Sequence, residues 1–169
     1  VWHDPAHLLV LLNEFAAKPS SEEREVLLLA ALFHDAIYNP RRADNEEASA
    51  QLLLSHAQNP ESTAVQRAAA IVRASKWDVA PSDPLTWEFW EADCRPLSPN
   101  LPLSERLNYE RAVFREFQFA PWATYLEKRG EFLRAWAKKF PQQKAGVEIC
   151  LELLQGLKPR VAIYPGSFD

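Results

Sequence analysis

Hydrophobic residues recur at helical spacing along nearly the whole chain. Between residues 3 and 17, for example, Leu8, Leu11, Leu12 and Phe15 fall on one face of a helix. Prolines and short polar stretches separate the segments with this pattern, and the 169 residues include only four glycines. The pattern therefore predicts an all-α domain, a bundle of about seven or eight helices. The expected helices span residues 3–17, 21–38, 44–57, 62–76, 85–94, 104–119, 122–140 and 143–157.

The second expected helix differs from the others because its stretch Val26–Phe33 is apolar on every face. A helix with no polar face is usually surrounded by other elements. Ser21, followed by Glu23 and Glu25, is a suitable N-cap with an acidic first turn. We therefore expect this helix to be central and the most deeply buried.

The end of the chain has a different pattern. Arg160–Tyr164 is a short β-type run, and Pro165 and Gly166 follow as a turn. A single strand has no partner in an all-α domain. We therefore expect residues 1–157 to form the helical domain, and residues 158–169 to be a linker and the first strand of a second domain that continues beyond Asp169.

Composition narrows the classes of function. The formal net charge of −4 argues against a nucleic-acid partner, because Arg41–Arg42 and Lys138–Lys139 are isolated basic pairs. The longest apolar run, eight residues, is too short for a bilayer, which needs about 20. The two cysteines are far apart and predict a protein of the reducing cytoplasm. The tryptophans at 87, 90, 122 and 136 suit either a core or the interface of a homo-oligomer.

The dipeptide His34–Asp35 is the first candidate for chemistry. Adjacent helical residues point about 100° apart, so both side chains can reach one centre only near a helix end. Buried polar groups need partners. A divalent metal ion bound by imidazole and carboxylate would satisfy both side chains, and so would a hydrogen-bonded His–Asp pair in the core.

Three more residues could contribute ligands. His3 and His7 are four residues apart and share one face of the first expected helix, and Asp93 lies in the aromatic stretch Trp90–Cys94. Each alone also suits an ordinary surface or core-edge position. A site of imidazoles and carboxylates could take Mn, Fe, Ni, Zn, Co or Mg.

The sequence resembles the HD superfamily of metal-dependent phosphohydrolases, in particular a small bacterial group. The resemblance is carried by Leu32–Ala50, which contains the Phe-His-Asp, the Pro-Arg loop and Asp-Asn-Glu-Glu, and by Trp2–Leu8, Ala74–Lys76 and Glu91–Asp93. The match reaches to about residue 157. It implies a helical HD fold and one divalent metal ion held by His3, His34, Asp35 and Asp93, with His7 as an additional site residue.

The resemblance also implies an activity, the hydrolysis of a phosphoester in a nucleotide or another small phosphorylated molecule. Glu46 or Glu47 would assist proton transfer, and Arg42 and Lys76 would neutralise substrate phosphate. Glutamates in a first helical turn also have a purely structural use. Trp77 departs from the family, which usually has histidine after the lysine.

The tail carries a second resemblance. Arg160–Asp169 is similar to the first strand and loop of phosphopantetheine adenylyltransferase-like nucleotidyltransferases. The alternative to an enzyme is therefore a non-catalytic helical module that regulates or scaffolds a fused nucleotidyltransferase.

Overall fold

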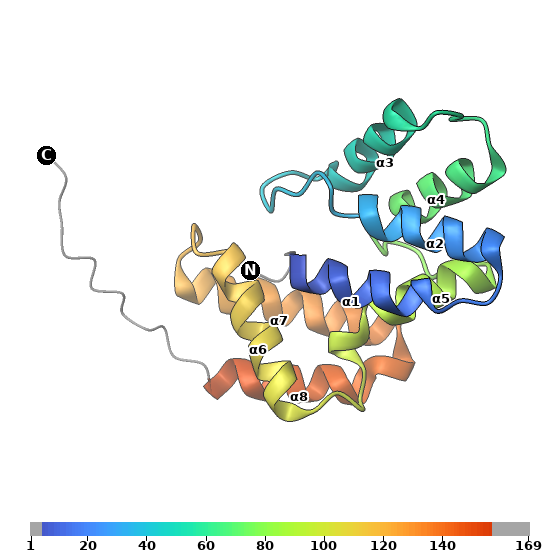
Figure 1. The fold of residues 1–169 in the computed structure, drawn as a ribbon. Helices are drawn as coiled ribbons and strands as arrows, with labels where there is room; N and C mark the ends of the chain where they lie inside the picture. The colour runs from blue at the N-terminus through green and yellow to red at the C-terminus, as the bar shows by residue number, and fades with distance from the viewer. Residues whose placement is uncertain (1–4, 157–169) are drawn as a thin grey trace, which may run out of the picture.

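The computed structural model describes residues 5–156, and this part of the chain is entirely helical (Figure 1). It contains eight α-helices and two short 3-10 helices, as the sequence pattern predicts for an all-α domain. His3 and the segment 158–169 lie outside the described residues. The elements are α1 (Pro5–Ala16), α2 (Ser21–Phe33), α3 (Asn45–His56), α4 (Thr63–Ala74), α5 (Pro84–Asp93), η1 (Arg95–Leu97), α6 (Leu103–Glu116), α7 (Trp122–Lys139), η2 (Pro141–Gln143) and α8 (Lys144–Gly156).

The start and end of α2 decide where the candidate residues lie. Ser20, rather than Ser21, is the N-cap, and its hydroxyl accepts a hydrogen bond from the Glu23 N–H at 3.3 Å. The helix ends at Phe33, before the predicted end at residue 38, and His34 is its C-cap. The chain leaves the helix because a tertiary contact replaces the helical ladder: the Ile37 N–H donates to the Ser49 hydroxyl at 3.0 Å. His34 and Asp35 therefore stand at a helix end.

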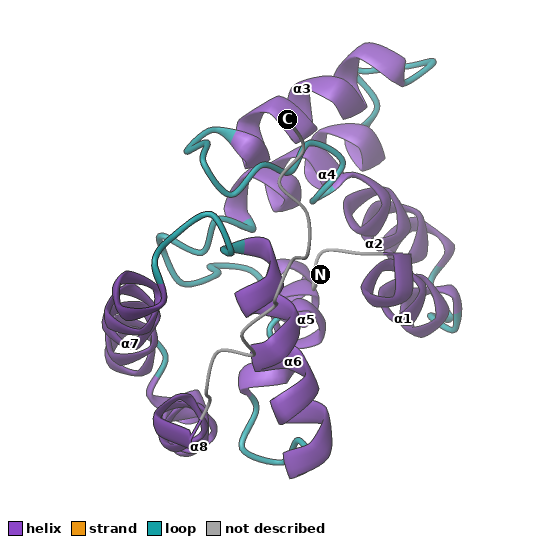
Figure 2. Cartoon of the chain, turned by 90° about the vertical axis from the view of Figure 1, so that its left-hand side faces the viewer, coloured by secondary structure: helices purple, strands orange, loops and turns teal. Residues whose placement is uncertain are grey.

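Helices α1–α4 form one packed group and α6–α8 a second, and α5 lies between them (Figures 1 and 2). As predicted, α2 is central to its group, in contact with α1, α3, α4 and α5. Val26, Leu27, Ala30 and Ala31 face this core, whereas Leu32 is 47% exposed. The apolar surface of α2 is therefore buried on most, but not all, of its faces.

Aromatic side chains of α5 join the two groups. The Phe89 ring stacks on Phe15 of α1, with centroids 5.7 Å apart. Trp90 stacks on Trp136 of α7 at 6.4 Å and contacts Phe140 at 4.8 Å. Trp90 and Trp136 are both buried, so these two tryptophans belong to the core.

Buried charges hold α6, α7 and α8 together. Arg106 is fully buried and donates to the carbonyl oxygens of Pro96 and Gly146 at 2.9 and 3.1 Å. Arg129 makes two parallel hydrogen bonds to Glu110, at 2.9 and 3.1 Å. A side chain at Gly146 would collide with the backbone of Leu97, because an added Cβ would lie 2.1 Å from its carbonyl oxygen. These contacts fix the second group of helices against η1.

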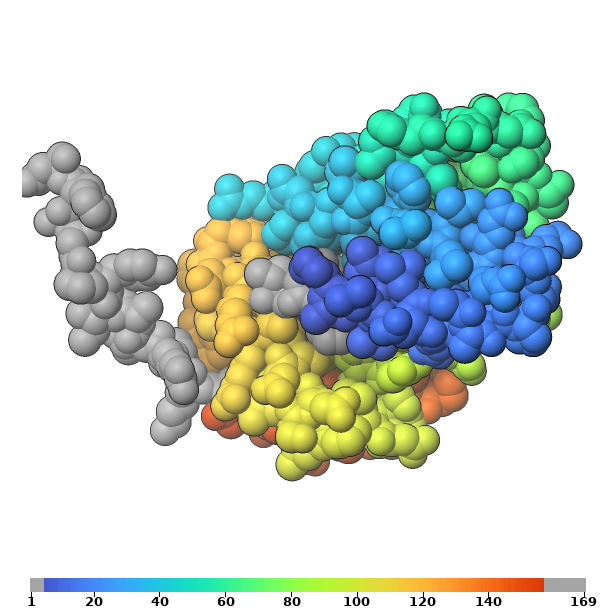
Figure 3. All heavy atoms as spheres, in the orientation of Figure 1, coloured from blue at the N-terminus to red at the C-terminus, as the bar shows by residue number. Residues whose placement is uncertain are grey.

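The loop after α2 reaches the turn between α6 and α7, as the space-filling view shows (Figure 3). There the Arg41 guanidinium lies 4.4 Å from the centroid of the Phe119 ring. Within residues 5–156, none of the helices combines the length and the apolar character needed to cross a membrane.

Candidate metal centre

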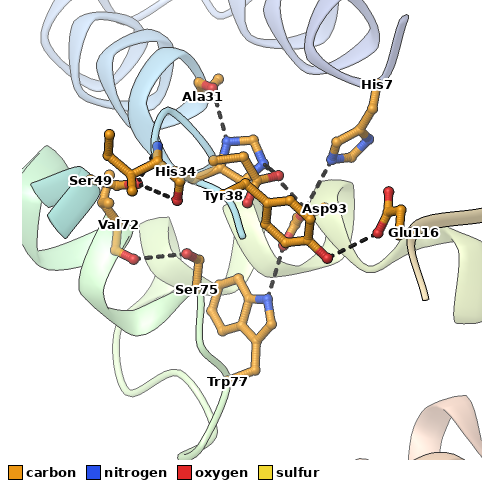
Figure 4. Close-up of polar contacts among 12 residues, drawn as sticks. His7, Ala31, His34, Tyr38, Ser49, Val72, Ser75, Trp77, Asp93 and Glu116 are labelled. Carbon is orange, nitrogen blue, oxygen red and sulfur yellow. Dashed lines mark hydrogen bonds and ion pairs between the residues drawn. The ribbon is translucent and has the colours of Figure 1, made fainter. Parts of the chain in front are cut away.

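Four of the predicted site residues come together where α1, α2 and α5 meet, and Figure 4 labels three of them, His7, His34 and Asp93. His7 lies near the start of α1, His34 and Asp35 directly follow α2, and Asp93 is the last residue of α5. The early end of α2 allows both His34 and Asp35 to face the same centre. His7 and Asp93, which are 86 positions apart in the sequence, are direct neighbours.

The distances are those of a compact cluster. One ligand atom each from His7, His34 and Asp35 lies within 4.8 Å of the other two. The Nε2 atom of His7 is 3.1 Å from Asp93 Oδ1. The Nε2 atom of His34 is 3.0 Å from Asp35 Oδ2 and 3.7 Å from Asp93 Oδ1. Two imidazoles and two carboxylates thus lie close together, with Asp93 beside both histidines.

The orientation of His34 suits a metal ligand. Its Nδ1 lies 2.9 Å from the Ala31 carbonyl oxygen, the position of an N–H donor, which directs Nε2 toward the carboxylates. Nε2 is buried and makes no hydrogen bond of ordinary geometry, although Asp35 is close enough for an ion pair. In a metal-bound imidazole, the ring nitrogen that does not bind the metal usually donates its N–H to a backbone carbonyl or a carboxylate.

Trp77 holds the other side of Asp93. Its indole N–H donates to Asp93 Oδ2 at 2.9 Å, while Oδ1 faces the two histidines (Figure 4). Trp77 has a φ of 53°, a left-handed conformation that is strained for a bulky residue. Its carbonyl accepts a hydrogen bond from Lys139 Nζ at 2.8 Å. The sequence marks Trp77 only as a departure from the family, and the structure makes it a partner of Asp93.

Neighbouring charges shift the pKa values of two cluster residues. Burial lowers the pKa of His34, but the close contact with the Asp35 carboxylate and the charge of Asp93 outweigh it and raise this pKa to about 9. Burial raises the pKa of Asp93, whereas the hydrogen bond from His7 and the charge of His34 lower it to about 2. Without a metal ion, the cluster therefore holds a proton on His34 and a negative charge on Asp93 at neutral pH.

A cavity of about 580 Å³ adjoins the cluster and is lined by His34, Asp35 and Asp93. Glu46, one of the two predicted proton-transfer residues, also lines it. The opposite wall comes from α6 and α7 and includes Glu116, which accepts a hydrogen bond from Tyr38 at 2.9 Å. The cavity and this Tyr38–Glu116 contact could not be inferred from the chain, because they join positions 78 residues apart.

Three other predicted residues, Glu47, Arg42 and Lys76, are exposed and lie outside the cavity lining, and His3 lies outside the described residues. Glu47 accepts hydrogen bonds from Arg73 at 2.7 Å and from Gln51 at 2.8 Å. Arg42 is paired with Asp44 at 2.8 Å. Lys76 lies 3.4 Å from Asp78 and donates to the Ala43 carbonyl oxygen at 3.3 Å. The structure thus brings Glu46, but not Glu47, Arg42 or Lys76, to the cavity.

Comparison of the chain with protein-family models, with curated proteins and with solved structures finds no significant match. The resemblance to the HD superfamily therefore stays a prediction that rests on the motifs in the sequence.

Proposed function

We propose that the chain is a metal-dependent phosphohydrolase that cleaves a phosphoester of a nucleotide or another small phosphorylated molecule. One observation carries this proposal: His7, His34, Asp35 and Asp93 converge beside a cavity large enough for a small ligand. Catalytic metal centres have this combination of clustered nitrogen and oxygen donors with an adjoining space for substrate.

The donor set fits a first-row divalent cation or magnesium. Imidazole nitrogen and carboxylate oxygen suit Mn, Fe, Ni, Zn, Co and Mg. His34 Nε2, buried without an aligned hydrogen bond, is the atom whose environment a cation would complete. Asp35 and Asp93 supply two negative charges, which would balance those of the ion.

Each residue of the site would have a distinct role in hydrolysis. A bound cation would lower the pKa of a water molecule and polarise a phosphoryl oxygen. Asp93, fixed by Trp77, and His34, fixed by Ala31, would hold the ligand geometry. Glu46 on the cavity wall is the candidate to accept a proton from the attacking water. The new bond joins the water oxygen to phosphorus, the ester P–O bond breaks, and the alcohol leaves with a proton.

Metal content tests this proposal. We expect about one metal ion per chain in the purified protein after incubation with Mn²⁺, and less than about a tenth of that in Asp35→Ala. Glu61→Ala, which removes an exposed acid away from the cluster, is the matched control and should retain the metal. Hydrolysis of phosphate esters should disappear together with the metal in Asp35→Ala.

Absence of metal from both the unaltered protein and the control would overturn the proposal. It would favour the non-catalytic helical module instead. Hydrolysis that survives in Asp35→Ala would equally contradict the assignment of the reaction to this cluster.

A further inference from the structure

The far wall of the cavity beside the metal centre is aromatic. His34, Asp35 and Asp93 line one part of the cavity, and rings from the end of α6, the following turn and α7 line another. These rings belong to Phe117, Phe119, Tyr125, Phe132 and Trp136. A volume of about 580 Å³ exceeds what one phosphate group needs and leaves room for a ring system beside it.

Two of these rings are partly exposed to solvent. Phe119 is 47% exposed and Phe132 is 45% exposed, and they come from different elements, the turn after α6 and the middle of α7. Exposed apolar side chains gathered around a cavity are typical of a surface that binds an apolar group. Arg41 and Arg129 lie against these two rings, at 4.4 and 5.1 Å from their centroids.

The charges around the cavity restrict the ligand further. Besides Asp35 and Asp93, Glu46 and Glu116 line the wall. The two basic residues among the described lining residues, Arg129 and Lys128, are each paired with a glutamate. Arg129 is bonded to Glu110 through two hydrogen bonds, and Lys128 is paired with Glu131 at 2.9 Å. A cation bound by two carboxylates has little charge left for more than one phosphoryl group.

We infer, on the basis of the proposed function, that the substrate is a phosphate monoester of an alcohol that bears an uncharged aromatic group. The phosphoryl group would lie at the metal centre and the aromatic group among Phe119, Phe132 and Trp136. Substrates with additional negative charge, such as di- and triphosphates, would bring that charge toward Glu46 and Glu116.

Binding of three matched phosphonates to the Mn²⁺-loaded protein tests this inference by calorimetry. 3-Phenylpropylphosphonate and propylphosphonate differ only in the ring, and a para-carboxylate on the ring adds one charge. We expect the phenyl compound to bind at least about tenfold more tightly than the propyl compound, because the ring leaves water. The carboxylate should remove most of that gain.

Two substitutions on α7 test where the phenyl ring of the phosphonate binds. Thr124 and Ala123 are adjacent and both exposed, but only Thr124 lines the cavity. Thr124→Trp should therefore reduce the difference between the phenyl and propyl compounds to less than about threefold while metal content is unchanged. Ala123→Trp, the control, should retain the full difference.

The outcomes separate the two proposals. Equal affinity for the phenyl and propyl compounds, with metal bound, overturns the aromatic substrate and leaves the metal-dependent hydrolase intact. A full difference in Thr124→Trp overturns the assignment of the ring to this cavity. Failure of the protein to bind Mn²⁺ contradicts both the proposed function and the inference that rests on it.

Discussion

Two regions of the molecule bury charged side chains, and they do so in opposite ways. Among α6, α7 and α8, the buried Glu110 carboxylate receives two hydrogen bonds from Arg129, so an anion and a cation compensate each other. Where α1, α2 and α5 meet, two carboxylates surround two imidazoles, and His34 Nε2 has no aligned partner. The first arrangement is complete within the protein, whereas the second would be completed by a cation.

This difference separates a structural role from a binding role. Breaking a completed buried pair leaves a charge without compensation, which destabilises the fold. Changing a residue of the incomplete cluster removes part of the proposed binding site. Stability measurements and metal-binding measurements should therefore respond to different substitutions.

The largest effect on stability is expected from Glu110→Gln. The substitution leaves the Arg129 guanidinium buried without its counter-charge and should reduce the free energy of unfolding by about 3–5 kcal/mol. Urea denaturation of the metal-free protein measures this loss. The double variant Glu110→Gln/Arg129→Met should lose less than the sum of the two single variants, and strict additivity would contradict the pairing.

The effect of metal on the stability of the whole domain is expected to be somewhat smaller. Mn²⁺ at about 100 times its dissociation constant should add about 2.7 kcal/mol to the free energy of unfolding, because the ion binds only the folded cluster. Chelation should reverse the gain. In Asp35→Asn the gain should be absent, and a protein stabilised equally by Mn²⁺ after this substitution would place the ion elsewhere.

Trp77→Phe tests the support behind Asp93. An aromatic side chain is retained, but the N–H that fixes Asp93 Oδ2 is lost, so metal affinity should fall by about 10- to 100-fold. Titration with Mn²⁺, followed by electron paramagnetic resonance, measures this affinity. Trp87→Phe, a partly buried tryptophan of α5 outside the cavity lining, should leave it unchanged.

The smallest of the expected effects is the change in metal affinity for each unit of pH. Below about pH 9 the metal-free cluster carries a proton on His34, whose pKa is raised to about 9. A cation must displace this proton, so affinity should rise by about tenfold per pH unit as the pH increases toward that value. Calorimetry in buffers with different ionisation enthalpies should detect a proton released on binding. An affinity that does not vary between pH 6 and about 8 would contradict this linkage.

Prediction from sequence succeeded best for the elements whose pattern is local. All eight expected helices are present, because apolar periodicity and proline positions are properties of short segments. The end of α2 was predicted too late, at residue 38, because the hydrogen bond from Ile37 to Ser49 comes from another element. Of the candidate ligands, His34 and Asp35 lie close to His7, which was predicted as an additional site residue, and Asp93 lies beside both histidines. Their binding of a metal stays a prediction, and His3 lies outside the described residues.

The sequence by itself determined that the chain folds into helices and that a few histidines and aspartates are available as ligands. Helical periodicity and the side-chain chemistry of His34 and Asp35 are local properties, so they can be inferred without the fold. Only the tertiary structure decided which acids face the cavity, that Trp77 fixes Asp93, and that aromatic rings of α6 and α7 form the opposite wall. These relations depend on how helices far apart in the chain pack, because contacts such as that between His7 and Asp93 exist only once the core has formed.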